Sequence, residues 1–169
     1  MIVLSIVSLL FSFLLQGLWF KFIPYTIDSL SILCTSFVLI NLVILQEYYE
    51  DSKKFCIFII VLGLLVDIVY NGIAFLSLLI FIIIYYIIRR LYYIFPYNYL
   101  TVNLFSLLAI IIYNILTFLF LIVVGYDNYS LLVLLKIIGC NIIMTIIYTS
   151  LLYYVIGLLV KKFELRVIR

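Results

Sequence analysis

The chain has 169 residues, of which 70% are apolar and only 10% are charged. Soluble domains are about 45–50% apolar and about 25% charged, so this composition excludes a soluble enzyme, a disordered chain and a nucleic-acid-binding protein. A bilayer-spanning helix needs about 20 residues, so residues 1–169 hold about six spans in a single membrane domain. The fold class is all-α, because hydrocarbon requires every backbone hydrogen bond to form inside the spanning segment.

Breaks in the apolar pattern separate the predicted transmembrane helices. The first helix has neither a preceding basic residue nor a small-residue cleavage site, so we expect it to be retained rather than removed as a signal peptide. Asn71-Gly72 is a turn signal between the third and fourth helices, and Arg89-Arg90 marks the expected end of the fourth. The predicted spans are residues 2–20, 29–46, 55–70, 73–88, 100–124 and 131–160.

Basic residues are distributed asymmetrically in this topology. Eight of the ten Lys and Arg residues fall on one side of the predicted membrane. The positive-inside rule places that side in the cytoplasm, so both termini are expected to be cytoplasmic. The eight residues are Lys53, Lys54, Arg89, Arg90, Lys161, Lys162, Arg166 and Arg169.

Polar side chains recur on one face of several predicted helices. Small hydroxyl and amide side chains on one face of a membrane helix favour helix packing. A ligand pocket lined by the amides is the alternative, and the spacing does not select between the two. The sets are Ser5, Ser8, Ser12 and Gln16; Ser31, Thr35 and Asn41; Asn103, Ser106, Asn114 and Thr117; and Asn141, Thr145 and Thr149.

Two charged residues, Asp67 and Lys136, fall within predicted spans, which makes them candidates for function or pairing. Gly63 lies one turn before Asp67 on the same face, where it lets another backbone approach. Asp67 could instead reach interfacial water at a helix end, and Lys136 could extend its stem to the outer headgroups. A third possibility is a salt bridge between the two near the outer face.

The sequence offers no constellation for catalysis. It contains no histidine, and it lacks the GxSxG, P-loop, HExxH and DDxxD patterns. Cys34, Cys56 and Cys140 stand alone in apolar runs, which favours packed thiols over a metal site. We therefore expect a non-enzyme with no catalytic, metal-binding or cofactor-binding residues and no cofactor.

The stretch from Gly63 to Phe81 resembles the signature of the rod shape-determining protein MreD family. That family carries a G-x-x-x-D element, a short turn with glycine and then an apolar run. Gly63, Asp67 and Gly72 match this pattern. The motif covers about 20 residues, while the size and the six predicted spans match the family over the whole chain.

Other positions both support and depart from the resemblance. The first helix contains Leu15-Gln16, similar to the Leu-Gln often found there in the family. Ile27 stands where proline is usual, and Phe75 stands where a further glycine is common. The residues singled out by the resemblance and by the intramembrane charges are Gln16, Gly63, Asp67, Gly72 and Lys136.

The resemblance implies a non-catalytic subunit of the bacterial cell-elongation complex, or elongasome, in the plasma membrane. Such proteins help to maintain cell shape by assembling MreC and, through it, MreB, RodA and a class B penicillin-binding protein for peptidoglycan synthesis and cell wall organisation. The implied partners therefore include an MreC-like protein and membrane lipids, with no nucleic acid. The family's fold is similar to that of substrate-binding subunits of energy-coupling-factor transporters. A subunit that binds a vitamin-like small molecule is the alternative function.

Overall fold

A computed structural model describes residues 2–22, 36–49, 52–71, 73, 75–125 and 131–162. All regular structure within these ranges is helical. The elements are α1 (Ile2–Phe22), α2 (Phe37–Leu45), the 3₁₀ turn η2 (Gln46–Tyr48), α3 (Ser52–Val66), the π-helical turn η3 (Asp67–Asn71), α4 (Leu76–Ile94), α5 (Tyr99–Val123) and α6 (Leu131–Lys162).

Four of the described segments are long and apolar enough to cross a membrane, so the chain is an all-helical membrane protein. Their outward faces carry large apolar side chains, as lipid contact requires; Val123, for example, is 84% exposed. Val3–Trp19 and Phe37–Tyr48 are shorter apolar helices. The four segments are Lys54–Asn71, Leu76–Ile94, Tyr99–Val123 and Leu134–Lys162.

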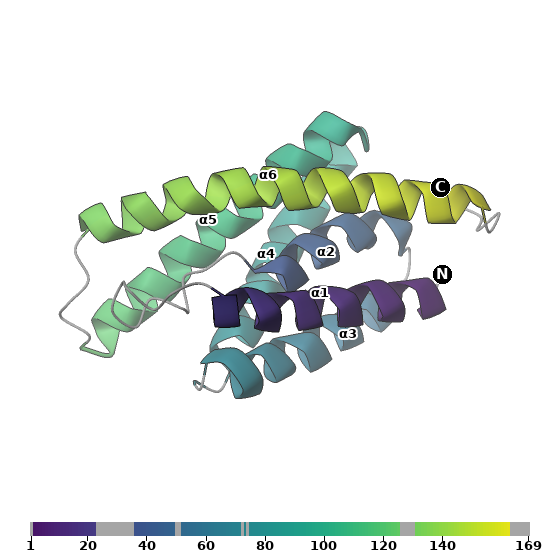
Figure 1. The fold of residues 1–169 in the computed structure, drawn as a ribbon. Helices are drawn as coiled ribbons and strands as arrows, with labels where there is room; N and C mark the ends of the chain where they lie inside the picture. Colours follow the sequence, from purple (N-terminus) through teal and green to yellow (C-terminus); the bar gives the residue numbers. More distant parts are fainter. Residues whose placement is uncertain are drawn as a thin grey trace.

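The short helix α2 forms the centre of the bundle. All nine of its residues are buried, and it packs against α1, α5 and α6 (Figure 1). A helix that is apolar all round belongs in such a core. Together α2 and η2 span about 18 Å at 1.5 Å per residue, which is about three fifths of the hydrocarbon thickness of roughly 30 Å. Of the expected span 29–46, the structure describes only residues 36–46. Residues 29–35 lie outside the described ranges.

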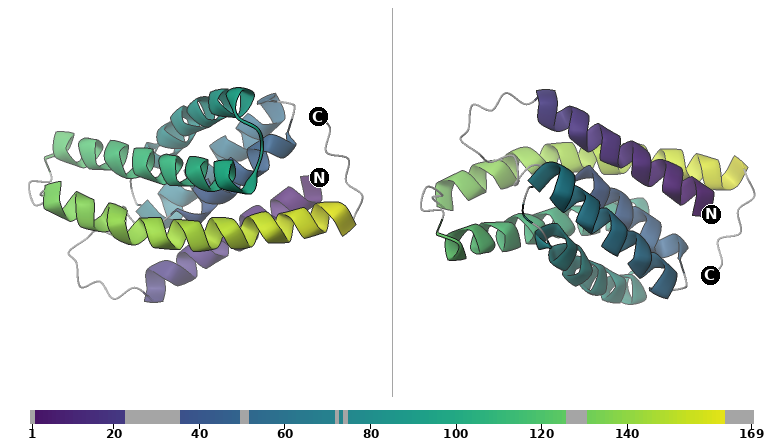
Figure 2. Two further views of the ribbon diagram at one scale, coloured as in Figure 1. Left: turned by 90° about the horizontal axis from the view of Figure 1, so that it is seen from above. Right: turned by 90° about the horizontal axis from the view of Figure 1, so that it is seen from below.

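The longer helices form hairpins around α2. Figure 2 shows α5 and α6 side by side and antiparallel, and α3 packs against α4. The first turns of α1 and the last turns of α6 lie at the same end of the bundle, where α3 also begins (Figure 1). We call this the basic end, because the side chains of Lys54, Lys161 and Lys162 are exposed there.

The fourth helix differs from the prediction at both ends. It begins at Leu76 rather than residue 73, and it continues through Arg89 and Arg90 to Ile94. Arginine is a good helix former whose long stem lets its charge reach the headgroups, so the Arg pair does not end the helix. The helix ends only at Phe95, the residue before Pro96, where the proline ring disfavours helical geometry.

Candidate functional site

The candidate site begins at Gly63, in the last turn of α3. A Cβ atom built on Gly63 would lie only 2.7 Å from the Cα of Leu78 and 3.2 Å from its backbone nitrogen. Both neighbours are backbone atoms, which cannot rotate away as the tip of a flexible side chain can. The first turn of α4 therefore lies directly against α3, and the backbone that approaches Gly63 belongs to the same chain.

Asp67 lies one turn further along and is completely buried. One carboxylate oxygen accepts hydrogen bonds from the backbone N–H of Ser77 at 2.8 Å and from the Asn71 side-chain amide at 3.1 Å. The other oxygen accepts from the backbone N–H of Leu78 at 3.2 Å. Ser77 and Leu78 belong to the first turn of α4, whose N–H groups have no partner within the helix. Asp67 therefore caps α4 from the preceding helix.

The negative charge of Asp67 suits this position. The amino terminus of a helix carries partial positive charge, and N–H bonds to a carboxylate are stronger than bonds between neutral groups. Phe75 occupies the N-cap position of α4 and offers no side-chain acceptor. The carboxylate thus replaces the Ser, Thr, Asp or Asn that most helices use at that position. Because Asp67 is sealed from solvent, the expectation that it reaches interfacial water is wrong.

The same hydrogen-bonded cluster extends to a third helix. The Asn71 amide also donates to the Ser77 hydroxyl at 2.5 Å. That hydroxyl lies 3.4 Å from the phenol oxygen of Tyr113 on α5. We call Asp67, Asn71, Ser77 and Tyr113 the Asp67 cluster. It joins the end of α3, the start of α4 and the middle of α5 by polar contacts inside the membrane domain.

The turn between α3 and α4 contains the only non-glycine residue with positive φ in the described ranges. Phe75 has φ 68° and ψ −1°, in the left-handed region. Side chains with a Cβ are disfavoured there, and glycine is the usual occupant. This is the position where the resemblance leads one to expect a further glycine. Gly72 itself lies outside the described residues.

Lys136 does not pair with Asp67, so the proposed salt bridge is wrong. Lys136 is exposed, and the donors that bind the Asp67 carboxylate in the described part of the chain come from Asn71, Ser77 and Leu78. The helix lengths explain the separation. From the basic end, 13 residues from Lys54 to Asp67 span about 20 Å, whereas 25 residues from Lys161 to Lys136 span roughly 38 Å. Along their helices, Lys136 therefore lies about 18 Å further from the basic end than Asp67 does.

Gln16 contributes to a second buried polar cluster, around α2. Its side-chain oxygen accepts a hydrogen bond from the backbone N–H of Val38 at 3.3 Å. The Ser36 hydroxyl accepts from the N–H of Leu39 at the same distance. Both N–H groups belong to the first turn of α2, which begins inside the protein. Gln16 therefore caps α2 from α1, as Asp67 caps α4 from α3.

Ser12, one turn before Gln16, joins three helices. Its hydroxyl oxygen accepts hydrogen bonds from the Asn41 amide of α2 at 2.7 Å and from the Tyr148 phenol of α6 at 2.8 Å. The sequence identified Ser12 and Asn41 as members of polar faces. Tyr148 was missed, because a single tyrosine gives no signal in a chain with 16 of them. Through these contacts, the polar faces hold α1, α2 and α6 together.

A further set of buried polar atoms finds no hydrogen-bond partner within the described residues. Asn41 keeps one unpaired amide oxygen, and neither amide atom of Asn114 has a partner. The hydroxyls of Ser106 on α5 and of Thr149 on α6 are also unpaired. All four side chains are completely buried. We call Ser106, Asn114 and Thr149, which lie on the buried faces of α5 and α6, the α5–α6 seam, and it contrasts with the Asp67 cluster.

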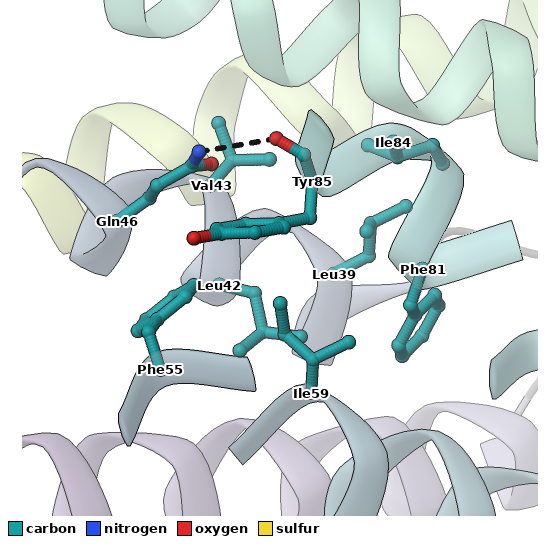
Figure 3. A pocket seen from close by; sticks show the side chains of 9 residues that line it. All are labelled: Leu39, Leu42, Val43, Gln46, Phe55, Ile59, Phe81, Ile84 and Tyr85. Carbon is teal, nitrogen blue, oxygen red and sulfur yellow. Dashed lines mark hydrogen bonds between the residues drawn. The ribbon is translucent and has the colours of Figure 1, made fainter. Parts of the chain in front are cut away.

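A small pocket lies between α2, α3 and α4 (Figure 3). It is lined mainly by apolar side chains, and Gln46 donates a hydrogen bond to the backbone oxygen of Tyr85 at its edge, at 3.1 Å. Its cavity volume is about 10 Å³, which is room for about one water molecule and far below the range of about 300–1,000 Å³ typical of ligand sites. None of the five singled-out residues lines it.

In comparisons with known proteins, no family model, curated protein or solved structure matches this chain. Within the described residues, no group of three or more Cys, Asp or Glu side chains could hold a metal ion. The arrangement holds α3, α4 and α5 together through hydrogen bonds.

Proposed function

We propose that the protein is a non-catalytic, MreD-like scaffold subunit of the bacterial cell-elongation complex, which holds an MreC-like partner in the plasma membrane. The observation that carries this proposal is the structural role of the motif residues. Gly63 and Asp67 join α3 to α4 through a backbone contact and a helix cap. The elements that resemble the family signature thus build a rigid helical hairpin, which is what a membrane scaffold needs.

The polar groups of the site support a scaffold over an enzyme. A catalytic carboxylate must be free to bind substrate or exchange a proton. Both oxygens of Asp67 are instead bonded to groups of the same chain, out of reach of solvent. A vitamin-binding subunit would need a cavity of ligand size, and the pocket beside α2 is smaller than that.

The proposed topology has six spans and both termini in the cytoplasm. It is supported by the common end of α1 and α6 (Figure 1) and by the exposed Lys54, Lys161 and Lys162 at that end. Single cysteines engineered at Asn128 and Lys162, in a chain without native cysteines, test it. A membrane-impermeant thiol reagent added to whole cells should label position 128 and spare position 162. The reverse labelling pattern would overturn the topology.

Depletion in the source bacterium tests the function. We expect rod-shaped cells to become round and an MreC-like protein to co-purify with a tagged copy of the chain. Re-expression of the wild-type chain should restore both, whereas a chain carrying Asp67→Ala should restore neither. If depleted cells keep their shape and instead lose uptake of a vitamin, the scaffold proposal is wrong.

A further inference from the structure

The last turns of α4 carry two adjacent arginines, Arg89 and Arg90, in a helix that contains no acidic residue. Arg89 is half-buried and Arg90 is exposed. The 19 residues of α4 extend over about 28 Å at 1.5 Å per residue, close to the hydrocarbon thickness of roughly 30 Å. The two arginines therefore lie near the boundary between hydrocarbon and headgroups, where paired cations attract a group of opposite charge.

Tyrosine side chains hold the guanidinium of Arg89 in place. It donates a hydrogen bond to the phenol oxygen of Tyr85, one turn earlier, and its Cζ atom lies 5.7 Å from the centre of the Tyr85 ring. Tyr85 is itself buried, and its ring packs against that of Phe55 on α3 with the centroids 5.6 Å apart (Figure 3). The phenol of Tyr93, one turn further along α4, lies beside the same guanidinium. Because these contacts orient the planar group in advance, less conformational entropy is lost when an anion binds it.

A stripe of exposed side chains leads along α4 to the second arginine. Steps of four, three, four and three residues place its members on one helix face. They are Leu79, Ile83, Tyr86, Arg90 and Tyr93. From Leu79 to Arg90 the stripe measures about 16 Å, which is about half of the hydrocarbon thickness, or the depth of one leaflet. Because α4 lies at the edge of the bundle in both views of Figure 2, this face meets lipid.

We propose that this end of α4 binds an anionic phospholipid, whose headgroup carries a net negative charge. The phosphate oxygens accept hydrogen bonds from the guanidinium groups of Arg89 and Arg90, since the guanidinium fork matches the geometry of phosphate. One acyl chain lies along Leu79 and Ile83, at the depth where the stripe is apolar. The exposed phenol of Tyr93 lies among the headgroups, where amphipathic rings are favoured. The site does not depend on the proposed scaffold role.

Lipid retention by the purified chain tests the site. In native mass spectrometry from a neutral detergent, the wild-type chain should retain phosphatidylglycerol in preference to phosphatidylcholine. The double variant Arg89→Gln, Arg90→Gln should bind phosphatidylglycerol at least about fivefold more weakly, the effect of about one basic residue at a membrane surface. The matched control is Lys161→Gln, Lys162→Gln, which removes the same charge from the exposed end of α6 and should bind nearly as well as wild type. Equal losses in the two variants, or equal retention of the two lipids by wild type, overturn the proposal.

Two single variants separate the charge from its positioning. Arg90→Gln changes an exposed side chain, so its weaker binding cannot come from a lost core contact; binding equal to wild type overturns the proposal. Tyr85→Phe keeps both charges but removes the phenol that holds Arg89, and it should weaken binding by a smaller factor. Unchanged binding there would contradict a preformed site. Soluble glycerol phosphate has the charge without the acyl chains and should not displace the bound lipid at equal concentration. If it does, the ligand is phosphate alone and the lipid proposal is wrong.

Discussion

The Asp67 cluster and the α5–α6 seam are both buried polar regions of one membrane domain, yet they are built differently. Both oxygens of the Asp67 carboxylate are bonded to backbone or side-chain donors, whereas the side chains of Ser106 and Asn114 in the seam have no partner in the described chain. A buried carboxylate without partners costs far more than a buried neutral amide or hydroxyl. The chain itself therefore satisfies the carboxylate completely, whereas it leaves several neutral buried groups without a partner in the described residues.

Removal of the Asp67 carboxylate should have the largest effect. Asp67→Ala leaves two backbone N–H groups of α4 and the Asn71 amide without their acceptor. At about 1–3 kcal/mol for each unsatisfied buried group, we expect the free energy of unfolding to fall by roughly 3–5 kcal/mol in detergent. Asp67→Asn keeps one carbonyl acceptor and should lose about half as much. Equal losses for the two variants would show that the cap is not what stabilises the hairpin.

The close approach at Gly63 should give the next largest effect. Gly63→Ala forces α4 away from α3, which should cost about 1–3 kcal/mol through overpacking. The control is Gly139→Ala on α6, where an added Cβ meets nothing within 4 Å and alanine favours the helix by up to about 1 kcal/mol. Chemical unfolding of the isolated chain measures both. Similar effects from both substitutions would mean that α3 and α4 do not pack as described.

Loss of the Gln16 cap should destabilise α2 by a smaller amount. Gln16→Leu keeps the bulk of the side chain but removes the acceptor for the Val38 N–H. Loss of a helix cap costs about 0.5–2 kcal/mol, and the buried position favours the upper part of that range. Hydrogen exchange of the Val38 amide should accelerate in the variant while that of Ile110 in α5 stays unchanged. Unchanged exchange at Val38 would contradict the cap.

A substitution in the α3–α4 turn should raise stability slightly. Glycine adopts the left-handed backbone of Phe75 without the strain that a Cβ causes there. Phe75→Gly should therefore stabilise the domain by up to about 1 kcal/mol, because the Phe75 side chain is 59% exposed and little packing is lost. Phe75→Ala retains the Cβ strain and is the matched control. A fall in stability confined to the glycine variant would contradict a strained turn.

The smallest effect is expected from Lys136. Lys136→Met should change the free energy of unfolding by less than about 0.5 kcal/mol, as is usual for exposed positions without special contacts. A double-mutant cycle with Asp67→Asn should show coupling near zero, since the two residues do not touch. Coupling above about 0.5 kcal/mol would restore the salt bridge that the helix geometry excludes.

Of the Asp67 cluster, residue spacing singled out only Asp67, together with its neighbour Gly63, and it gave no sign of the groups that satisfy the carboxylate. The four-residue step placed Gly63 and Asp67 on one face, and glycine indicated that a backbone approaches there. The turn after η3 places α4 against α3, so the backbone that approaches Gly63 is that of α4. The sequence also pointed to an ion pair between Asp67 and Lys136, because intramembrane charges need partners. It did not show that backbone N–H groups ten and eleven residues further along would satisfy the carboxylate.

The sequence by itself determined that this is a helical membrane protein, because 70% apolar composition and uninterrupted apolar runs leave no other way to satisfy the backbone in lipid. It also determined which residues share a helix face, since that depends only on the 3.6-residue period. Only the tertiary structure decided which buried groups meet. Gln16 reaches α2, Tyr148 reaches Ser12 and α2 becomes the core through contacts between distant segments, whose register depends on the packing of the whole bundle rather than on any local pattern.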